Sequence, residues 1–241
     1  MLIYKYDANV FMRVSSGVDG FDQLIDGGFR SNRLYVLSGP PGSGKTTFSA
    51  QFMTAGAAAD ESSLYVSMHE TRDGIIADMA GFDFGFQAAI ESDSITFLDA
   101  LSSEGRRFFG GPGEKMDRTN VTNRLAGFIN SREIDRVVID STMLLRYLFD
   151  DSDTTLMRFL TAIKRTSATT LLISEMTDPS AYADEHFLAH GVVFFHNYLE
   201  DDGMRRGIQV IKMRGTDTDT DIHTLSFADS GIEITTGKSV S

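Results

Sequence analysis

The feature that most constrains the fold of this chain is a glycine-rich loop between a short apolar run and an Ala-rich segment. Residues 39–46 read GPPGSGKT and satisfy the pattern G-x-x-x-x-G-K-[ST]. The apolar run Leu34 to Leu37 predicts a strand before the loop, and Thr46 to Ala59 predict a helix after it. In that setting the glycines let the backbone curl so that its N–H groups point at phosphate oxygens, and the helix N-terminus adds partial positive charge. The segment therefore predicts a site for a nucleoside triphosphate.

Each residue of this loop is a candidate contact to the ligand, together with the threonine that follows it. These candidates are Gly39, Pro40, Pro41, Gly42, Ser43, Gly44, Lys45, Thr46 and Thr47. We expect the Lys45 ammonium to reach the β- and γ-phosphates and the Thr46 hydroxyl to coordinate Mg²⁺. We also expect Lys45 to face the surface when no nucleotide is bound.

Two acidic residues follow other apolar runs. Asp140 ends the run from Arg136, and a carboxylate in that position holds Mg²⁺ directly or through water in many nucleotide sites. Because many strands end in an acid, this signal depends on the phosphate loop upstream and on the intervening strand. Glu175 follows a later run and fits two interpretations equally, a sensor of the γ-phosphate or a solvated loop acid.

Apolar runs alternate with helical patterns through most of the chain. The expected strands are 34–37, 64–67, 95–98, 136–140 and 169–173, and helical patterns separate most of them, among them 120–129 and 155–166. Strands that lack polar alternation and are spaced by helices are typical of a parallel sheet covered on both faces. The pattern predicts an α/β fold with a mainly parallel central sheet flanked by helices.

The C-terminal quarter follows a different pattern. Four further strands are expected at 192–195, 207–212, 223–227 and 232–235 without helices between them, and glycine-containing turns lie at 201–203 and 229–231. We therefore expect the sheet to continue as antiparallel strands. No Pro- or Ser-rich linker and no internal repeat interrupts the sequence, which predicts one domain over residues 1–241. The glycine-rich stretch Glu104 to Lys115 is expected to be irregular, either a surface loop with its aromatic residues packed on the body or a mobile loop over a ligand.

Composition limits the partners and the location. The formal net charge is −12, with 24 Asp and 10 Glu against 16 Arg and 6 Lys. That charge argues against nucleic acid, whose non-specific binding depends on neutralising phosphates. An Asp-rich and Lys-poor surface is the usage that we associate with proteins of salt-accumulating microbes, the alternative being an acidic protein of an ordinary cytoplasm. No apolar run approaches the roughly 20 residues of a membrane-spanning helix. The chain has no cysteine and its first residues lack the apolar core of a secretory signal, so we expect a cytoplasmic protein.

Five motifs in order carry a family resemblance. They are Ser16 to Gly28, Gly39 to Thr47, Tyr65 to Glu70, Val137 to Ser141 and Ile211 to Gly215. Together they resemble the KaiC branch of the RecA-type ATPases over about residues 14–236, and in particular the single-domain KaiC-like proteins of archaea. The resemblance implies a RecA-like fold, ATP with Mg²⁺ as ligands, and a halophilic archaeon as a fitting source for the acidic composition.

The resemblance also implies catalytic residues. In the family two consecutive Glu follow the second strand and prepare the attacking water, whereas this chain has His69 and Glu70. The role passes to Glu70, and His69 is either a substitute base, since imidazole titrates near neutral pH, or a loss that slows turnover. The family's Lys-Met-Arg-Gly strand points into the nucleotide of a neighbouring subunit, so the resemblance gives Lys212 and Arg214 a role in trans and implies a homo-oligomeric ring or filament with ATP at the subunit interface.

Three functions follow from these observations. The first is an ATPase whose nucleotide state controls assembly or signalling to an unknown protein partner. The second is a nucleotide-gated binding module with negligible turnover, which the exchange of one Glu for His69 favours. The third, a recombinase-like protein associated with DNA, is disfavoured by the acidic charge and by the lack of a recognisable DNA-binding N-terminal domain.

Overall fold

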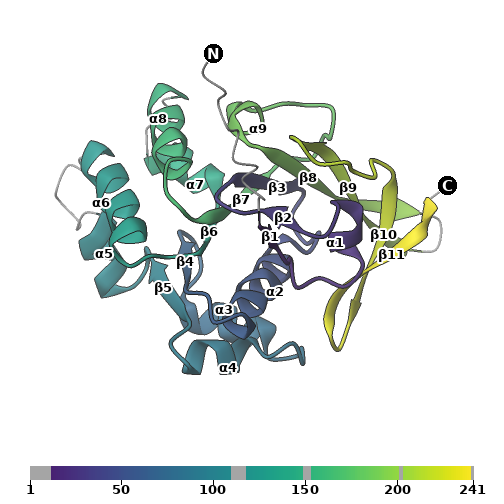
Figure 1. Ribbon diagram of the computed structural model, residues 1–241, viewed down its shortest axis with the longest axis horizontal. Coiled ribbons are helices and arrows are strands. Elements are labelled where there is room, and N and C mark those ends of the chain that lie inside the picture. The colour runs from purple at the N-terminus through teal and green to yellow at the C-terminus, as the bar shows by residue number, and fades with distance from the viewer. Residues whose placement is uncertain (1–11, 110–117, 149–152, 201–202, 240–241) are drawn as a thin grey trace, which may run out of the picture.

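The computed structural model describes residues 12–109, 118–148, 153–200 and 203–239. Its centre is one large sheet among these residues, drawn across the middle of Figure 1. The strand order is β11 (Gly231–Ser239), β10 (Ile222–Ala228), β9 (Gly203–Met213), β8 (Gly191–Glu200), β3 (Leu34–Gly39), β7 (Thr169–Glu175), β6 (Arg136–Asp140), β4 (Ser63–Ser67) and β5 (Ile95–Asp99).

Strands β8 to β5 in this order are parallel, and β9, β10 and β11 continue the sheet antiparallel. The predicted α/β fold, mainly parallel with antiparallel C-terminal strands, is confirmed. The first of the four expected C-terminal strands differs in one respect, because β8 itself runs parallel to β3 and the antiparallel part begins with β9.

Helices cover both faces of the parallel part of the sheet, which is why central strands such as β3, β4 and β6 are buried on both sides. One face packs against α1 (Phe21–Leu24), α2 (Lys45–Ala58), α3 (Arg72–Met79) and α4 (Phe86–Glu91) (Figure 1). The other packs against α5 (Ser103–Phe109), α6 (Arg118–Ser131), α7 (Thr142–Leu148), α8 (Asp153–Ile163) and α9 (Asp184–Leu188). A two-stranded ribbon of β1 (Arg13–Val14) and β2 (Phe29–Arg30) precedes the sheet. No helix in the described part of the chain is long and apolar enough to cross a membrane.

The core fixes the start of α2, the helix that follows the phosphate loop. Phe48 is fully buried in its first turn, and its ring meets Phe21 edge-on at 4.9 Å and Phe195 of β8 at 5.5 Å between centroids. Such edge-to-face aromatic contacts are directional as well as apolar. The helix N-terminus is therefore held against both the N-terminal segment and the central sheet.

The expectation of an irregular stretch from Glu104 to Lys115 is wrong for its first half. Residues 103–109 form α5, and residues 110–117 lie outside the described residues. The Ser102 hydroxyl accepts a hydrogen bond from the Gly105 N–H at 2.9 Å, which caps the helix. Gly105 is used for close packing instead of a turn, because a Cβ there would collide with the Asp99 carbonyl. The packed interpretation of the aromatic residues is confirmed, with the Phe108 ring 6.1 Å from that of Phe128.

Strand register determines which residues meet at each edge of the sheet. Gly39 pairs with Glu175 and Ser67 pairs with Asp140, so the carboxyl ends of β3, β7, β4 and β6 open on one edge. Parallel α/β sheets bind their ligands at this edge.

Candidate nucleotide-binding site

The phosphate loop curls between β3 and α2 as its glycines require. Gly39, Gly42 and Gly44 have φ values of 146°, 72° and 105°, a region that residues with a side chain rarely adopt. At Gly44 a Cβ would also press against Phe227 and Ile232 of the C-terminal strands. The loop is thus closely backed by β10 and β11 on one side.

Lys45 differs from expectation. Its side chain is 6% exposed, and Nζ donates to the Gly39 and Pro40 carbonyls at 2.7 and 2.8 Å. Burial lowers the pKa of the Lys45 ammonium, an effect that the negative charges of Glu175 and Asp140 oppose. The prediction of a surface-facing lysine is therefore wrong, because the loop folds its own carbonyls around the ammonium.

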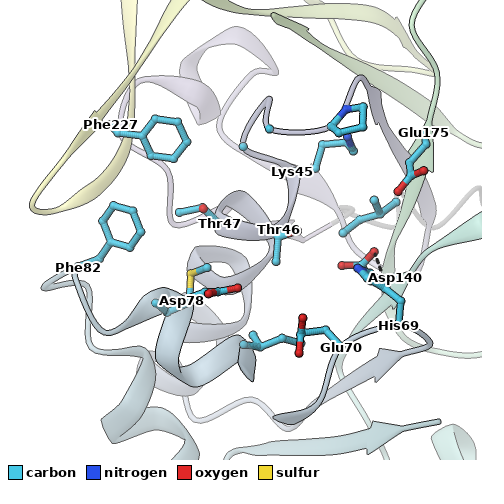
Figure 2. A pocket seen from close by; sticks show the side chains of 16 residues that line it. Lys45, Thr46, Thr47, His69, Glu70, Asp78, Phe82, Asp140, Glu175 and Phe227 are labelled. Carbon is cyan, nitrogen blue, oxygen red and sulfur yellow. Dashed lines mark ion pairs between the residues drawn. The ribbon is translucent and has the colours of Figure 1, made fainter. Parts of the chain in front are cut away.

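Asp140 is buried at the end of β6 beside two partners. The Tyr65 hydroxyl donates to Asp140 Oδ2 at 3.0 Å, and His69 Nδ1 lies 3.9 Å from Oδ1 (Figure 2). Burial raises the pKa of the Asp140 carboxyl, while His69, Tyr65 and Lys45 act in the opposite direction. The carboxylate is thus oriented by a phenol that sequence reasoning missed.

Glu70 is positioned by the turn that links β4 to α3. The Ser67 hydroxyl donates to the Glu70 carbonyl at 2.6 Å and accepts from the Glu70 N–H at 3.1 Å, and Glu70 Oε1 accepts from the Thr71 N–H at 3.0 Å. Gly74 in the first turn of α3 makes room for the carboxylate, because a Cβ there would collide with Oε1. Glu70 lines the same cavity as Thr46 (Figure 2).

These groups face one cavity of about 460 Å³ at the carboxyl edge of the sheet. The predicted residues that line it are Pro41, Gly42, Gly44, Lys45, Thr46, Thr47, His69, Glu70, Asp140 and Glu175. Residues that the sequence did not single out also line it, namely Ile75, Asp78, Met79, Phe82, Ile173 and Phe227. In Figure 2 Phe82 and Phe227 lie at the end of the cavity away from Asp140 and Glu175.

Two polar residues, Asn197 of β8 and Arg206 of β9, hold the outer side of the phosphate loop. Arg206 Nε donates to the Gly42 carbonyl at 3.1 Å, and Asn197 Nδ2 donates to the Pro41 carbonyl at 3.4 Å. The Arg206 guanidinium also lies over the Phe227 ring, 5.1 Å from its centroid. No local motif marks either residue, since both act across the sheet.

Lys212 and Arg214 do not reach this cavity in their own chain. Lys212 pairs with Val192, which pairs with Val36, so it lies three residues before Gly39 along the sheet, or about 10 Å from that edge. Its Nζ donates instead to the His186 and Phe187 carbonyls at 2.8 and 3.3 Å. The structure thus separates these two cations from the nine loop residues, Glu70 and Asp140.

The fold and the site define a nucleotide-binding domain of the phosphate-loop class with a RecA-type sheet. The family model described as "ATPase: KaiC" matches residues 14–239, and the chain belongs to this family of ATPases.

Known proteins agree with that placement. The circadian clock oscillator protein KaiC of Synechococcus elongatus is 30% identical over 226 residues, which are 90% of this chain and 43% of that protein. The KaiC of Parathermosynechococcus lividus is 29% identical over 228 residues, 91% of this chain and 41% of its own. The chain therefore spans less than half the length of these curated relatives. The crystal structure of a KaiC-like protein from Pyrococcus horikoshii superposes with a TM-score of 0.79 at 27% identity, covering 93% of this chain and 99% of that one.

Proposed function

We propose that this chain binds Mg-ATP in the 460 Å³ cavity and hydrolyses it slowly or rapidly according to its assembly state, so that nucleotide state controls oligomerisation or a protein partner. The observation that carries the proposal is the convergence of Lys45, Glu70 and Asp140 on one cavity beside the N-terminus of α2. That convergence joins a phosphate cradle, a base and a metal ligand.

The donor set of the cavity fits a magnesium triphosphate. Ser43 Oγ is buried in the loop without a hydrogen-bond partner among the described residues. Gly44 has a φ of 105°, and a Cβ there would be tight against the Ile232 and Phe227 side chains. Thr46 and Asp140 supply the oxygen ligands that Mg²⁺ prefers. When bound, the ion neutralises charge on the phosphate oxygens.

Glu70 is the base that we favour, because its carboxylate faces the cavity from the end of β4. His69 is the alternative, and its imidazole Nδ1 lies 3.9 Å from Oδ1 of the buried Asp140 carboxylate. A nucleotide-gated module with negligible turnover remains the second candidate function, favoured by that exchange of a carboxylate for an imidazole.

The Glu70→Gln variant tests the chemistry. It is expected to bind ATP with wild-type affinity and to lose turnover by about 10²- to 10⁴-fold, because the amide cannot accept the proton of the attacking water. ATP hydrolysis and calorimetric binding are measured together, and His69→Ala is the matched control, with turnover retained. If His69→Ala loses turnover while Glu70→Gln keeps it, the base is misassigned. A wild-type chain that binds ATP without turnover supports the gated module.

The aromatic end of the cavity is the place that we propose for the nucleobase. The Phe82 and Phe227 rings stack with 6.1 Å between their centroids and 27° between their planes. The guanidinium of Arg206, a residue of β9, lies over the Phe227 ring. Exposed aromatic faces stack with any base, and each such contact contributes about 1–3 kcal/mol. Asp78 lines the same part of the cavity and offers an acceptor for an exocyclic amine.

Replacing Phe227 separates base from phosphate recognition. Phe227→Ala is expected to weaken ATP binding roughly 5- to 150-fold, the equivalent of about 1–3 kcal/mol. Binding of inorganic triphosphate should not change, because the ring does not contact phosphates. Phe108→Ala, which removes a half-buried ring at the far edge of the sheet, is the control for aromatic loss. Equal weakening of both ligands by Phe227→Ala would show that the ring only supports the loop.

A further inference from the structure

The carbonyls in the last turn of the short helix α9 accept hydrogen bonds from three cationic side chains. Lys212 Nζ donates to the His186 carbonyl at 2.8 Å, Arg214 Nη2 to the Phe187 carbonyl at 3.3 Å, and Lys164 Nζ to the Leu188 carbonyl at 2.7 Å. Carbonyls at a helix C-terminus carry partial negative charge and stabilise cations. The direction of these carbonyls therefore sets where the Lys212 and Arg214 side chains lie.

The same helix is anchored on its inner side by two buried polar residues. Glu185 is 2% exposed, and its carboxylate accepts from Arg146 Nη2 and from the Ser174 hydroxyl, each at 2.9 Å. His186 is 3% exposed. Its Nδ1 accepts from the Ala183 N–H at 3.0 Å, so the neutral ring carries its proton on Nε2, which lies 3.3 Å from the Ser38 hydroxyl.

Glu185 and His186 contact strand residues that directly precede residues of the nucleotide site. Ser38 precedes Gly39, the first residue of the phosphate loop, and Ser174 precedes Glu175, which lines the cavity. The two strand positions are neighbours, since Ser38 pairs with Ser174 in the β3–β7 register. The five-residue helix α9 thus contacts Ser38 and Ser174 on one side and the two separated cations on the other. We call Ser38 and Ser174 the floor of this chain's own site, because each directly precedes a residue of the site.

We propose that Glu185 and His186 are positioning residues that hold α9 on the floor of one nucleotide site so that Lys212 and Arg214 are correctly placed for the site of the next subunit. This inference rests on the proposed function and on the role in trans that the family resemblance gives Lys212 and Arg214. It assigns α9 a mechanical link between neighbouring sites, because a shift of the strand ends at Ser38 and Ser174 moves the carbonyls that hold the cations.

Complementation in mixed oligomers tests the proposal. On the proposal each subunit supplies its own nucleotide site and the cations for the site of the next subunit, and these two parts can be mutated separately. Glu70→Gln removes the base of a subunit's own site and leaves its cations, whereas Arg214→Ala removes a cation and leaves the site. The reference mixture of these two variants is expected to recover ATP turnover. The first test variant is Glu185→Ala. Because it leaves the buried Ser174 hydroxyl without its acceptor, His186→Ala serves as a second test variant. Asp184→Asn, the neighbouring half-buried carboxylate of α9, is the matched control.

The proposal predicts which mixtures recover ATP turnover. Each test variant alone is expected to keep ATP affinity within about twofold and to lose about 10²-fold in kcat, the loss that a misplacement of about 1 Å in a distant supporting residue produces. Mixing with Glu70→Gln should restore turnover, since an intact site then meets intact cations. Mixing with Arg214→Ala should not, since both partners then supply defective cations. Asp184→Asn should behave as wild type in every mixture.

Other patterns overturn the inference in distinguishable ways. Rescue by Arg214→Ala but not by Glu70→Gln means that α9 supports only its own site. Wild-type turnover in both test variants means that Glu185 and His186 do not position the cations. If thermal melts show that one test variant is unfolded, so that both of its mixtures fail, the other test variant decides the question. If the reference mixture itself stays inactive while wild type hydrolyses ATP, the trans role has failed, and the positioning role fails with it.

Discussion

The Lys45→Ala variant is expected to lose measurable ATP binding under conditions where the wild type is saturated. Lys45 is the buried cation of the loop, and its ammonium donates to the Gly39 and Pro40 carbonyls. Removing one partner of a buried charge pair costs about 2–5 kcal/mol. That loss corresponds to a dissociation constant roughly 30- to several-thousand-fold higher.

Isothermal calorimetry with Mg-ATP measures this loss, and a thermal melt of the same sample confirms the fold. Lys164→Ala is the matched control for affinity, because Lys164 Nζ also donates to a backbone carbonyl, that of Leu188, but outside the cavity. It should bind ATP as the wild type does. Equal affinities of Lys45→Ala and wild type would mean that nucleotide binds elsewhere on the chain.

The Arg214→Ala variant is expected to bind ATP normally and to lose turnover by roughly 10³-fold or more, the typical contribution of a cation supplied in trans to phosphoryl transfer. Its own cavity keeps Lys45, Glu70 and Asp140, which explains the retained binding. In the same chain the Arg214 guanidinium bonds the Phe187 carbonyl of α9 and does not line the cavity, so we expect the loss to arise at the site of a neighbouring subunit.

Specific activity should therefore rise with protein concentration in the wild type, as measured by ATP turnover alongside light scattering with and without Mg-ATP. Arg205→Ala, which removes an exposed arginine of β9 whose guanidinium pairs with Glu200, controls for the loss of a surface charge. A rate per subunit that is independent of concentration, with Arg214→Ala as active as wild type, would contradict a shared site and favour a monomeric switch.

The residues that could be predicted are those whose role follows from local sequence. The loop is a contiguous pattern between a strand and a helix, and Asp140 ends an apolar run, so their meeting at one edge follows from parallel strand register. The fold class was predictable for the same reason, because strands that are buried on both faces carry no polar alternation.

The missed features depend on contacts between distant segments. Tyr65 orients Asp140 from 75 residues away, and Arg206 holds Gly42 from 164 residues away. Neither contact leaves a local pattern in the sequence. Lys45 was expected at the surface because a lysine next to a glycine turn is usually solvated, whereas the loop carbonyls enclose it. Helix α9 has only five residues, too few for a helical period to be recognised.

The phosphate loop lies at the carboxyl edge of the sheet, whereas Lys212 lies about 10 Å from that edge, and this separation of the loop from the cations has a consequence that can be counted. If Lys212 and Arg214 act in trans as proposed, identical chains associate head to tail, and such a contact either closes into a ring or continues as a filament. A filament always has one terminal loop without cations and one terminal pair of cations without a loop, so its activity per chain climbs gradually as it lengthens. A ring has no ends, so all of its sites are complete and its activity per chain has its full value at a finite mass, a value that a filament approaches but never reaches. The shape of activity against mean particle mass therefore distinguishes the two assemblies without an image of either.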